Sequence, residues 1–281
     1  MLASRQFLQR LLRGPAWELG QELRQKLRQK LGQALGRERR CLACTVIFKD
    51  EDATTLFCPE CTAAMPRQPR GFCPGCGEPA AWLELPLSLC AHCLDEPPLW
   101  QAFIFHGPYE GLLRKLLITL KFRDKPFLGY ALGMLLATHP GLTALNADTV
   151  VPVPLHSARL ARRGYNQAQE IARPLARCLK LPLTPDMLDR VLPTAPQTGT
   201  SRKTRKNNTR NAFAARGTVS GRHVLLVDDT LTTGATIAAA TEALLTSGAG
   251  SVSVAVVGRT SLHGFTGNFY NADKAAAACL S

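Results

Sequence analysis

Val224-Leu225-Leu226-Val227-Asp228-Asp229-Thr230-Leu231-Thr232-Thr233-Gly234-Ala235-Thr236 is the stretch that decides the fold. An apolar strand ends in two adjacent carboxylates, and a Thr/Gly loop leads into a helical stretch over residues 237–245. Backbone N–H groups in the loop can point at one anion, and the helix N-terminus adds a favourable dipole. Gly234 lets the backbone approach a ligand closely. The stretch therefore predicts a phosphate cradle, with Asp228 and Asp229 placed to accept hydrogen bonds from sugar hydroxyls or to face Mg²⁺.

This stretch resembles the 5-phosphoribosyl 1-pyrophosphate (PRPP) motif of type I phosphoribosyltransferases, with strand, acidic pair, T-T-G-x-T loop and helix in the same order. The resemblance implies that Asp228 and Asp229 are the catalytic pair that holds the ribose hydroxyls and Mg²⁺. It also implies that the 5-phosphate is bound by the following residues: Thr230, Leu231, Thr232, Thr233, Gly234, Ala235 and Thr236. Thr230 replaces an aliphatic residue that is usual in that family. The alternative is an ordinary strand–turn–helix connection, which does not need two consecutive Asp.

The accessibility of the acidic pair is a separate expectation. Because both carboxylates come at the end of the predicted strand, we expect them to be accessible to solvent. On that basis, Asp229→Ala should leave folding intact.

Basic residues follow another predicted strand, over residues 149–153. Arg159, Arg162 and Arg163 come after it. Since ligands of parallel α/β sheets bind beyond the carboxyl ends of strands, we expect these residues to meet the acidic pair and bind pyrophosphate. A basic stretch from Arg202 to Arg210, which includes Arg205, is predicted to be a mobile flap that closes over a polyanion. The alternative for this stretch is a disordered linker.

Eight of the ten cysteines form four C-x-x-C pairs. They are Cys41/Cys44, Cys58/Cys61, Cys73/Cys76 and Cys90/Cys93. Each pair can present two thiolates to one metal, so the pattern predicts two tetrahedral Zn²⁺ sites with four Cys ligands each. Such sites have no open position and are structural. We favour pairing in sequence order, with the first two pairs on one ion and the last two on the other. Interleaved cross-brace pairing is the alternative.

The charge of the 281-residue chain is strongly positive, with a formal net charge of +13. Residues 1–40 hold ten Lys/Arg and three Glu. Their Leu residues recur every four positions from Leu19 to Leu35, which predicts an amphipathic helix. This helix is expected to pack on the zinc module, with a partner protein or anionic lipid as alternatives. Basic charge also attracts nucleic acid and phosphorylated ligands, although a solvated surface is the simpler reading.

Alternation of strands and helices predicts an α/β fold, a parallel sheet with helices on both faces, preceded by a small Cys-rich double zinc ribbon. The expected strands are 100–105, 149–153, 224–228 and 252–257, and the expected helices are 109–122, 128–138, 167–179 and 234–247. The expected domains are a basic extension (1–40), a double zinc ribbon (41–96), a phosphoribosyltransferase-like domain (97–262) and a flexible tail (263–281). No apolar run reaches the ~20 residues of a membrane span, and the N-terminus lacks a signal-peptide core, so a cytoplasmic protein is expected.

Further motifs extend the resemblance. They are Leu-Lys-Phe at 120–122, R-G-Y-N-Q at 163–167, and Q-x-x-x-S-x-x-x-R-x-x-N-x-x-N-A-F at 197–213. With the motif at 224–236, they resemble the competence protein F (ComF) family and its enterobacterial DNA-utilisation relatives, over residues 41–260. That family joins a Cys-rich zinc module to a phosphoribosyltransferase domain. It is implicated in natural transformation, handling single-stranded DNA, and use of DNA as a nutrient.

Two classes of function follow from this resemblance. The first is an enzyme of the phosphoribosyltransferase type that uses PRPP and Mg²⁺. The second is a non-catalytic protein that handles single-stranded DNA, or a zinc-ribbon adaptor for DNA-uptake proteins, with the PRPP fold kept as a ligand sensor. The intact acidic pair favours ligand binding in both. Because no nucleobase pocket is recognisable and fold alone does not decide function, catalysis is left open.

Overall fold

The fold is described from a computed structural model, which covers residues 37–50, 56–65, 67–68, 71–79, 88–192, 212–217 and 219–261. The predicted Leu-rich helix, the flap with Arg202 and Arg205, and the C-terminal tail lie outside these residues. The chain divides into two compact units, Met1–Pro59 and Glu60–Ser281. In the described part, no helix combines the length and the apolar character that a membrane crossing requires.

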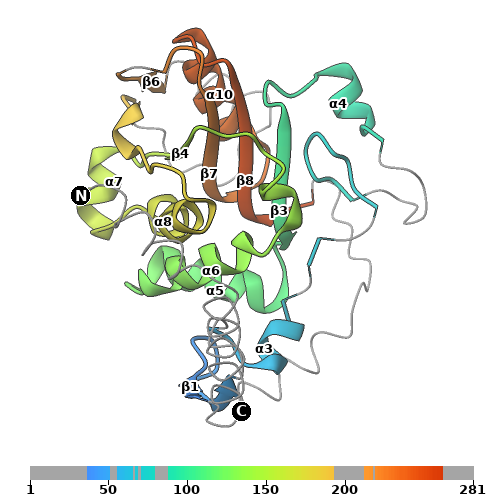
Figure 1. The fold of residues 1–281 in the computed structure, drawn as a ribbon, viewed down its shortest axis with the longest axis vertical. Coiled ribbons are helices and arrows are strands. Elements are labelled where there is room, and N and C mark those ends of the chain that lie inside the picture. Colours follow the sequence, from blue (N-terminus) through green and yellow to red (C-terminus); the bar gives the residue numbers. More distant parts are fainter. Residues whose placement is uncertain are drawn as a thin grey trace, which may run out of the picture. The chain divides into compact units, whose positions relative to one another are not determined.

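The larger unit is built on a parallel sheet (Figure 1). Its strand order is β3 (Ala102–Pro108), β8 (Ser251–Arg259), β7 (His223–Leu231) and β4 (Thr149–Pro152). Each neighbouring pair is parallel. The register places Val224 opposite Val252 on one side and Thr149 on the other. All four predicted strands are therefore present, and β7 occupies a central position.

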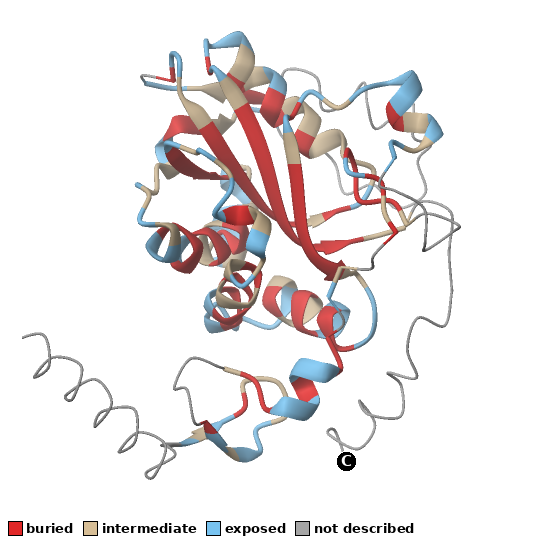
Figure 2. Ribbon diagram, turned by 45° about the vertical axis from the view of Figure 1, so that its right-hand side comes forward, coloured by how far each residue is buried: buried red, intermediate tan, exposed pale blue. Residues whose placement is uncertain are grey.

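Burial of the strands explains why helices cover both faces of this sheet. Residues 224–229 are all buried, and successive side chains on a strand point to opposite faces. Continuous apolar runs of this kind are typical of parallel strands covered on both sides. Figure 2 shows the buried strands at the centre of the larger unit. The predicted α/β fold class with a Cys-rich N-terminal part is confirmed.

The four longer helices agree closely with the predicted ranges. They are α5 (Gly111–Phe122), α6 (Phe127–Ala137), α8 (Gln167–Leu179) and α10 (Ala235–Thr246). On α5, Leu113, Leu117 and Leu120 are fully buried, as the helical spacing of its apolar residues predicts. Arg123 ends α5 by donating its backbone N–H to the Thr119 carbonyl at 2.9 Å.

Several short elements were not predicted. The helices are α3 (Pro59–Ala63), α4 (Ala91–Asp95) and α7 (Ser157–Arg163), with 3₁₀ turns η1 (Pro140–Leu142) and η2 (Pro185–Met187). The strands form two antiparallel pairs, β1 (Arg37–Arg40) with β2 (Ile47–Asp50) and β5 (Leu188–Arg190) with β6 (Phe213–Ala215). Elements of three to seven residues carry too little periodicity to be seen in sequence.

Candidate functional site

The acidic pair lies inside β7, because this strand continues to Leu231 rather than ending at residue 228 as predicted. Asp228 is 8% exposed and Asp229 only 4% exposed, so the expectation of solvent-accessible carboxylates is wrong. Neighbouring helices α5 and α8 supply groups that cover them. The Lys121 ammonium pairs with Asp229 and donates to the Thr230 hydroxyl at 3.0 Å, and Gln167 Nε2 donates to Asp229 Oδ1 at 3.4 Å.

The two carboxyl groups have opposite charge preferences. Burial, together with the neighbouring Asp229 charge, raises the pKa of Asp228 well above its ordinary value. Burial also acts to raise the pKa of Asp229, but the Lys121 ammonium outweighs it and holds that pKa below its ordinary value. Burial likewise opposes the charge on Lys121, and the Asp229 carboxylate raises the Lys121 pKa in spite of it. One cation therefore balances one carboxylate, and Asp228 ionises more readily when another positive group faces it.

Mg²⁺ fits this arrangement chemically. Carboxylate oxygens are its preferred protein ligands, and it is commonly held by one or two of them together with substrate phosphates. The raised pKa of Asp228 indicates a position where an additional cation, or hydroxyl donors, would stabilise the ionised form.

The predicted phosphate loop connects β7 to α10. Thr230 and Leu231 belong to the strand, Thr232, Thr233 and Gly234 form the turn, and Ala235 begins the helix. Gly234 is the residue before the helix and has a φ of 81°, a left-handed conformation that favours glycine. Among the described residues, no side chain caps the N-terminus of α10. The first-turn N–H groups of the 12-residue α10 are therefore oriented as an anion site requires.

The three basic residues that follow β4 lie on the short helix α7. Arg163 is half-buried, donates to Gln167 Oε1, and stacks over the Phe122 ring at 5.7 Å. Burial lowers the pKa of Arg163, and the Asp229 carboxylate partly offsets this effect. Arg163 is thus connected to Asp229 of the acidic pair through the Gln167 side chain. Arg162 is exposed and Arg159 is partly exposed.

The R-G-Y-N-Q segment joins several elements around the site. Tyr165 donates its hydroxyl to the Leu120 carbonyl on α5. Asn166 donates to the Val153 carbonyl at 3.0 Å, and its side chain accepts from Ala168 N at 3.1 Å to cap α8. Gln167 links Arg163 to Asp229. The segment therefore fixes α5, α8 and the strand end relative to the acidic pair.

Two site residues were not identified as such from sequence. Lys121 belongs to the Leu-Lys-Phe motif, and its position on an otherwise apolar helix face was a signal of a special role. Arg190 on β5 stacks over Phe213 at 5.3 Å. Burial and the nearby Arg159 lower the Arg190 pKa, while Asp228 acts to raise it. Arg190 could not have been found, because the pairing of β5 with β6 brings together residues 188–190 and 213–215 across a long intervening segment.

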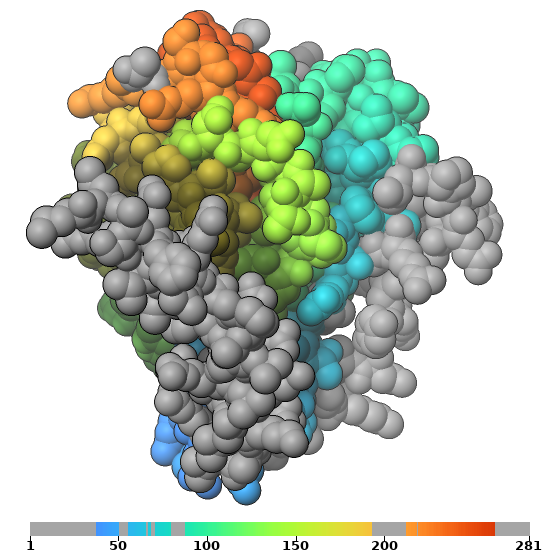
Figure 3. Space-filling model, in the orientation of Figure 1, coloured from blue at the N-terminus to red at the C-terminus, as the bar shows by residue number. Residues whose placement is uncertain are grey.

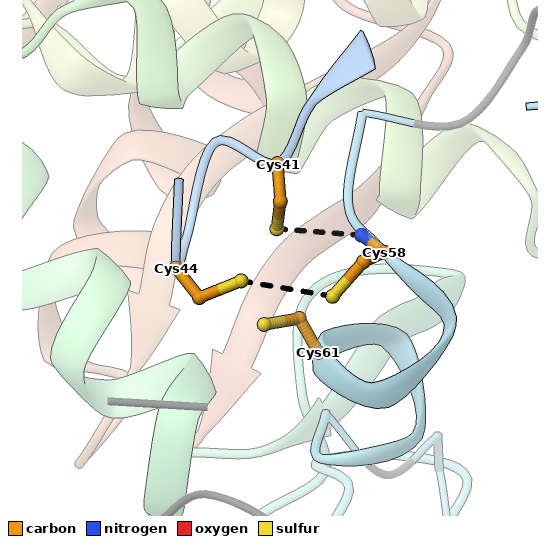
Figure 4. A group of neighbouring side chains, drawn as sticks. All are labelled: Cys41, Cys44, Cys58 and Cys61. Atoms are coloured by element: carbon orange, nitrogen blue, oxygen red, sulfur yellow. Dashed lines mark hydrogen bonds between the residues drawn. The ribbon is translucent and has the colours of Figure 1, made fainter. Parts of the chain in front are cut away.

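Eight cysteines form two clusters, and they group in sequence order as favoured. One cluster is Cys41, Cys44, Cys58 and Cys61, and the other is Cys73, Cys76, Cys90 and Cys93. Within each cluster the sulfur atoms lie within 4.8 Å of one another. Figure 4 shows the first set converging, with Cys58 N donating to Cys41 Sγ at 3.3 Å. Four converging sulfurs match the ligand set of a structural zinc site, so each cluster can hold one zinc ion.

The second cluster shows why a metal suits these sulfurs. A hydrogen bond from Cys76 lowers the pKa of Cys73 to about 4, and the same bond raises the pKa of Cys76. Burial raises the pKa of Cys93 to about 12. Crowded thiols therefore compete for protons, and a divalent cation would allow all of them to bind as thiolates.

Comparisons with known proteins agree with this geometry. Residues 146–261 match the model of the phosphoribosyl transferase domain family. The chain is 38% identical to the DNA utilization protein YhgH of Salmonella typhimurium over 209 residues, which cover 73% of this chain and 90% of that protein. It is 37% identical to the protein of the same name from Escherichia coli, with the same coverage.

A third relative is competence protein F of Haemophilus influenzae, 33% identical over 175 residues, with 58% of this chain and 75% of that protein covered. Among solved structures, TT1426 from Thermus thermophilus is similar, with 19% identity over 57% of this chain and 98% of that chain. Its TM-score of 0.29 is too low to support any inference.

Proposed function

This chain belongs to the ComF family, which includes DNA utilization protein YhgH and competence protein F, and we propose that it binds PRPP or a related phosphorylated ribose together with Mg²⁺. We further propose that it acts in DNA uptake or in the use of extracellular DNA, because the names of its relatives refer to DNA utilisation and competence. The observation that carries the first proposal is the continuous strand, acidic pair, loop and helix at 223–246.

Each part of the proposed site has a distinct role. The first turn of α10 binds the 5-phosphate through its N–H groups and dipole. Asp228 and Asp229 accept hydrogen bonds from the ribose hydroxyls, directly or through Mg²⁺-bound water. When bound, Mg²⁺ would neutralise pyrophosphate charge. Arg163 supports the same charge from the side of α7, with Arg159 and Arg162 nearby on that helix.

If the chain transfers phosphoribosyl groups, its residues act mainly by positioning and electrostatics. The acidic pair would orient the ribose, and the basic groups would stabilise the departing pyrophosphate. Lys121 keeps Asp229 ionised, so the carboxylate remains an acceptor. Release of pyrophosphate from PRPP in the presence of an acceptor would show that the site is catalytic.

A second candidate function is binding of single-stranded DNA without catalysis. The net charge of +13 favours it, and the basic flap with Arg202 and Arg205 is a candidate contact. Binding through phosphates would tolerate any sequence and would weaken with salt, with a slope of about −0.7 per phosphate contacted. DNA-uptake proteins are further candidate partners in this reading.

Parallel titrations distinguish these functions. Full-length protein would be titrated with PRPP plus Mg²⁺ and, separately, with single-stranded DNA from low to moderate salt. Saturable PRPP binding supports the phosphoribosyl site, and salt-sensitive DNA binding supports the DNA role. If PRPP does not bind at millimolar concentration, the site is vestigial. If DNA does not bind at low salt, direct DNA contact is refuted.

A further inference from the structure

The side chain of Arg259 at the end of β8 joins the second cysteine cluster to the phosphate loop. It is 2% exposed. Its Nε donates to the Cys76 carbonyl at 2.5 Å, and its Nη1 donates to the Thr232 carbonyl at 3.0 Å. Nη2 forms an ion pair with Glu78 at 2.8 Å. One guanidinium therefore bridges a metal-ligand residue, the acidic residue two positions after it, and the first residue of the turn.

Glu78 is itself fixed at both carboxylate oxygens. Oε2 accepts from Arg259, and Oε1 accepts from the Ser261 hydroxyl at 2.9 Å. The backbone of Glu78 also takes part in the Cys knuckle, since its carbonyl accepts from Cys73 N at 2.8 Å. Glu78 is 6% exposed. Because both partners of this ion pair are buried, moving either one away leaves a charge without its hydrogen bonds, which is strongly unfavourable.

Direct packing joins the same two regions. Gly77 has a φ of 70°, and a Cβ placed there would lie 2.6 Å from the Phe103 ring, so the knuckle backbone rests on β3. The Trp100 indole donates to the Gly75 carbonyl at 2.7 Å. A pocket of about 430 Å³ is lined by Cys76 and Cys93 of the cluster and by Trp100, Thr233 and Gly234. Figure 3 shows residues 88–100, in teal, beside the orange-to-red segment that includes α10.

We propose that metal binding at the second cysteine cluster sets the conformation of the phosphate loop, with Arg259 as the positioning residue that transmits it. A bound ion fixes the Cys76 thiolate, and with it the Cys76 carbonyl that Arg259 contacts. The guanidinium is a rigid planar fork, so displacement of one acceptor changes its geometry at the others. The Thr232 carbonyl then loses its Arg259 donor, the Leu231 carbonyl keeps only the Thr260 N–H, and the turn that carries Thr233 and Gly234 loosens.

This inference rests on the proposed function only in the identity of the ligand that the loop binds. Conformation of the loop can be measured without any ligand, by hydrogen exchange of full-length protein followed by mass spectrometry. A failure of PRPP binding in the wild type would refute the proposed function and leave the exchange result intact.

The experiment compares matched variants of the two clusters. Cys73→Ser alters the second cluster and Cys44→Ser the first, and each should lower bound zinc from about two ions per chain to about one. In Cys73→Ser, exchange at Ala238 and Thr260, whose N–H groups donate to the Gly234 and Leu231 carbonyls of the loop, should rise about tenfold, since exchange follows the free energy of local opening. In Cys44→Ser it should stay as in the wild type. Where PRPP binds, Cys73→Ser should weaken it about tenfold, the scale of losing one charged hydrogen bond.

Arg259→Lys tests the transmission itself and does not touch a metal ligand. It keeps the positive charge but not the fork, so zinc content should remain near two ions while exchange at Ala238 and Thr260 rises. Circular dichroism and unchanged exchange in β4 confirm that the sheet is folded. Unchanged loop exchange in Cys73→Ser after loss of zinc, or in Arg259→Lys, would overturn the proposal. Should Cys73→Ser fail to fold, the Arg259→Lys result decides.

Discussion

Lys121 and Asp229 form the buried ion pair that governs the charge of the acidic pair. Their side chains are 20% and 5% exposed, and Thr230 and Gln167 complete the hydrogen bonds around them. Removing the carboxylate leaves a cation that is largely shielded from water. This differs from the behaviour of a solvent-exposed strand-end carboxylate, whose removal costs little. Substitutions in this pair therefore affect stability as well as ligand binding.

Asp229→Ala should lower the free energy of unfolding by about 3 kcal/mol, because breaking a buried pair strands its partner. Adding Lys121→Met should recover part of that loss, since no uncompensated charge remains. Urea unfolding of the wild type, both single variants and the double variant measures the coupling. If the stability losses of the two single variants simply add up in the double variant, the interaction between Lys121 and Asp229 contributes nothing to stability.

At the scale of elements, the connection between β7 and α10 depends on the left-handed backbone of Gly234. An added Cβ would meet only the Trp100 ring, at 3.7 Å, which is ordinary contact. Substitution is therefore opposed by backbone strain and not by crowding. Gly217 has a similar φ of 72° with nothing within 4 Å of an added Cβ, which makes it a matched control.

Gly234→Ala and Gly217→Ala should both lose about 1 kcal/mol of stability, the usual cost of a left-handed non-glycine residue. Only Gly234→Ala should weaken PRPP binding, because relief of the strain tilts the N–H groups of the loop. Thermal unfolding and calorimetry on the two variants separate these effects. Equal PRPP affinity in both would show that the loop does not contact the phosphate.

Strand β3 carries a buried histidine that makes stability depend on pH. The pKa of His106 is lowered from 6.5 to about 4, mainly by burial, with a backbone hydrogen bond to Met65 acting to raise it and the nearby Arg67 and His139 adding to the lowering. Among the described residues, its Nε2 has no hydrogen-bond partner. Because the unfolded chain takes up this proton at a higher pH than the folded chain, the free energy of unfolding should fall as pH drops from about 6.5 to about 4.

The loss due to His106 should approach about 3 kcal/mol at the low end of this range. His106→Leu should flatten the pH dependence of the unfolding temperature between pH values of about 7 and 5. An unaltered slope in His106→Leu would assign the acid sensitivity to other groups.

Prediction from sequence succeeded where long periodic segments specify one element. The helix at 167–179 and the strands of the central sheet are of this kind. It failed for β7, where apolar residues end at Val227 but the strand runs on to Leu231, because ladder bonds to β8 continue past the acidic pair. Burial of Asp228 and Asp229 could not be predicted either, since α5 and α8 provide it from distant parts of the sequence.

At the scale of the whole molecule, the described residues include two cysteine clusters and one four-stranded parallel sheet. Sequence alone predicted both clusters, because each C-x-x-C places two thiols side by side, and it favoured the observed pairing in sequence order over a cross-brace. The contact of the second cluster with the phosphate loop through Arg259 could not be predicted. Arg259 lies 183 positions after Cys76 and 181 positions after Glu78, so no local sequence pattern marks these contacts.

Purified protein should contain two zinc ions per chain, and free thiolates should appear only after chelation. Elemental analysis with thiol titration measures this. Fewer than one zinc per chain, or disulfides in place of metal-bound thiolates, would contradict the assignment of both clusters.

Calorimetric titration of zinc-loaded, full-length protein with PRPP decides whether the acidic pair and the loop form a ligand site. With Mg²⁺ present, the wild type should show one saturable site, and leaving out Mg²⁺ should weaken it. Asp228→Asn should weaken PRPP binding by roughly 1–3 kcal/mol, the scale of losing a hydrogen bond to a charged group, while Asp186→Asn at an exposed position should not. No binding of PRPP to the wild type at millimolar concentration with Mg²⁺, or equal affinity in Asp228→Asn, would contradict a phosphoribosyl site at this strand end.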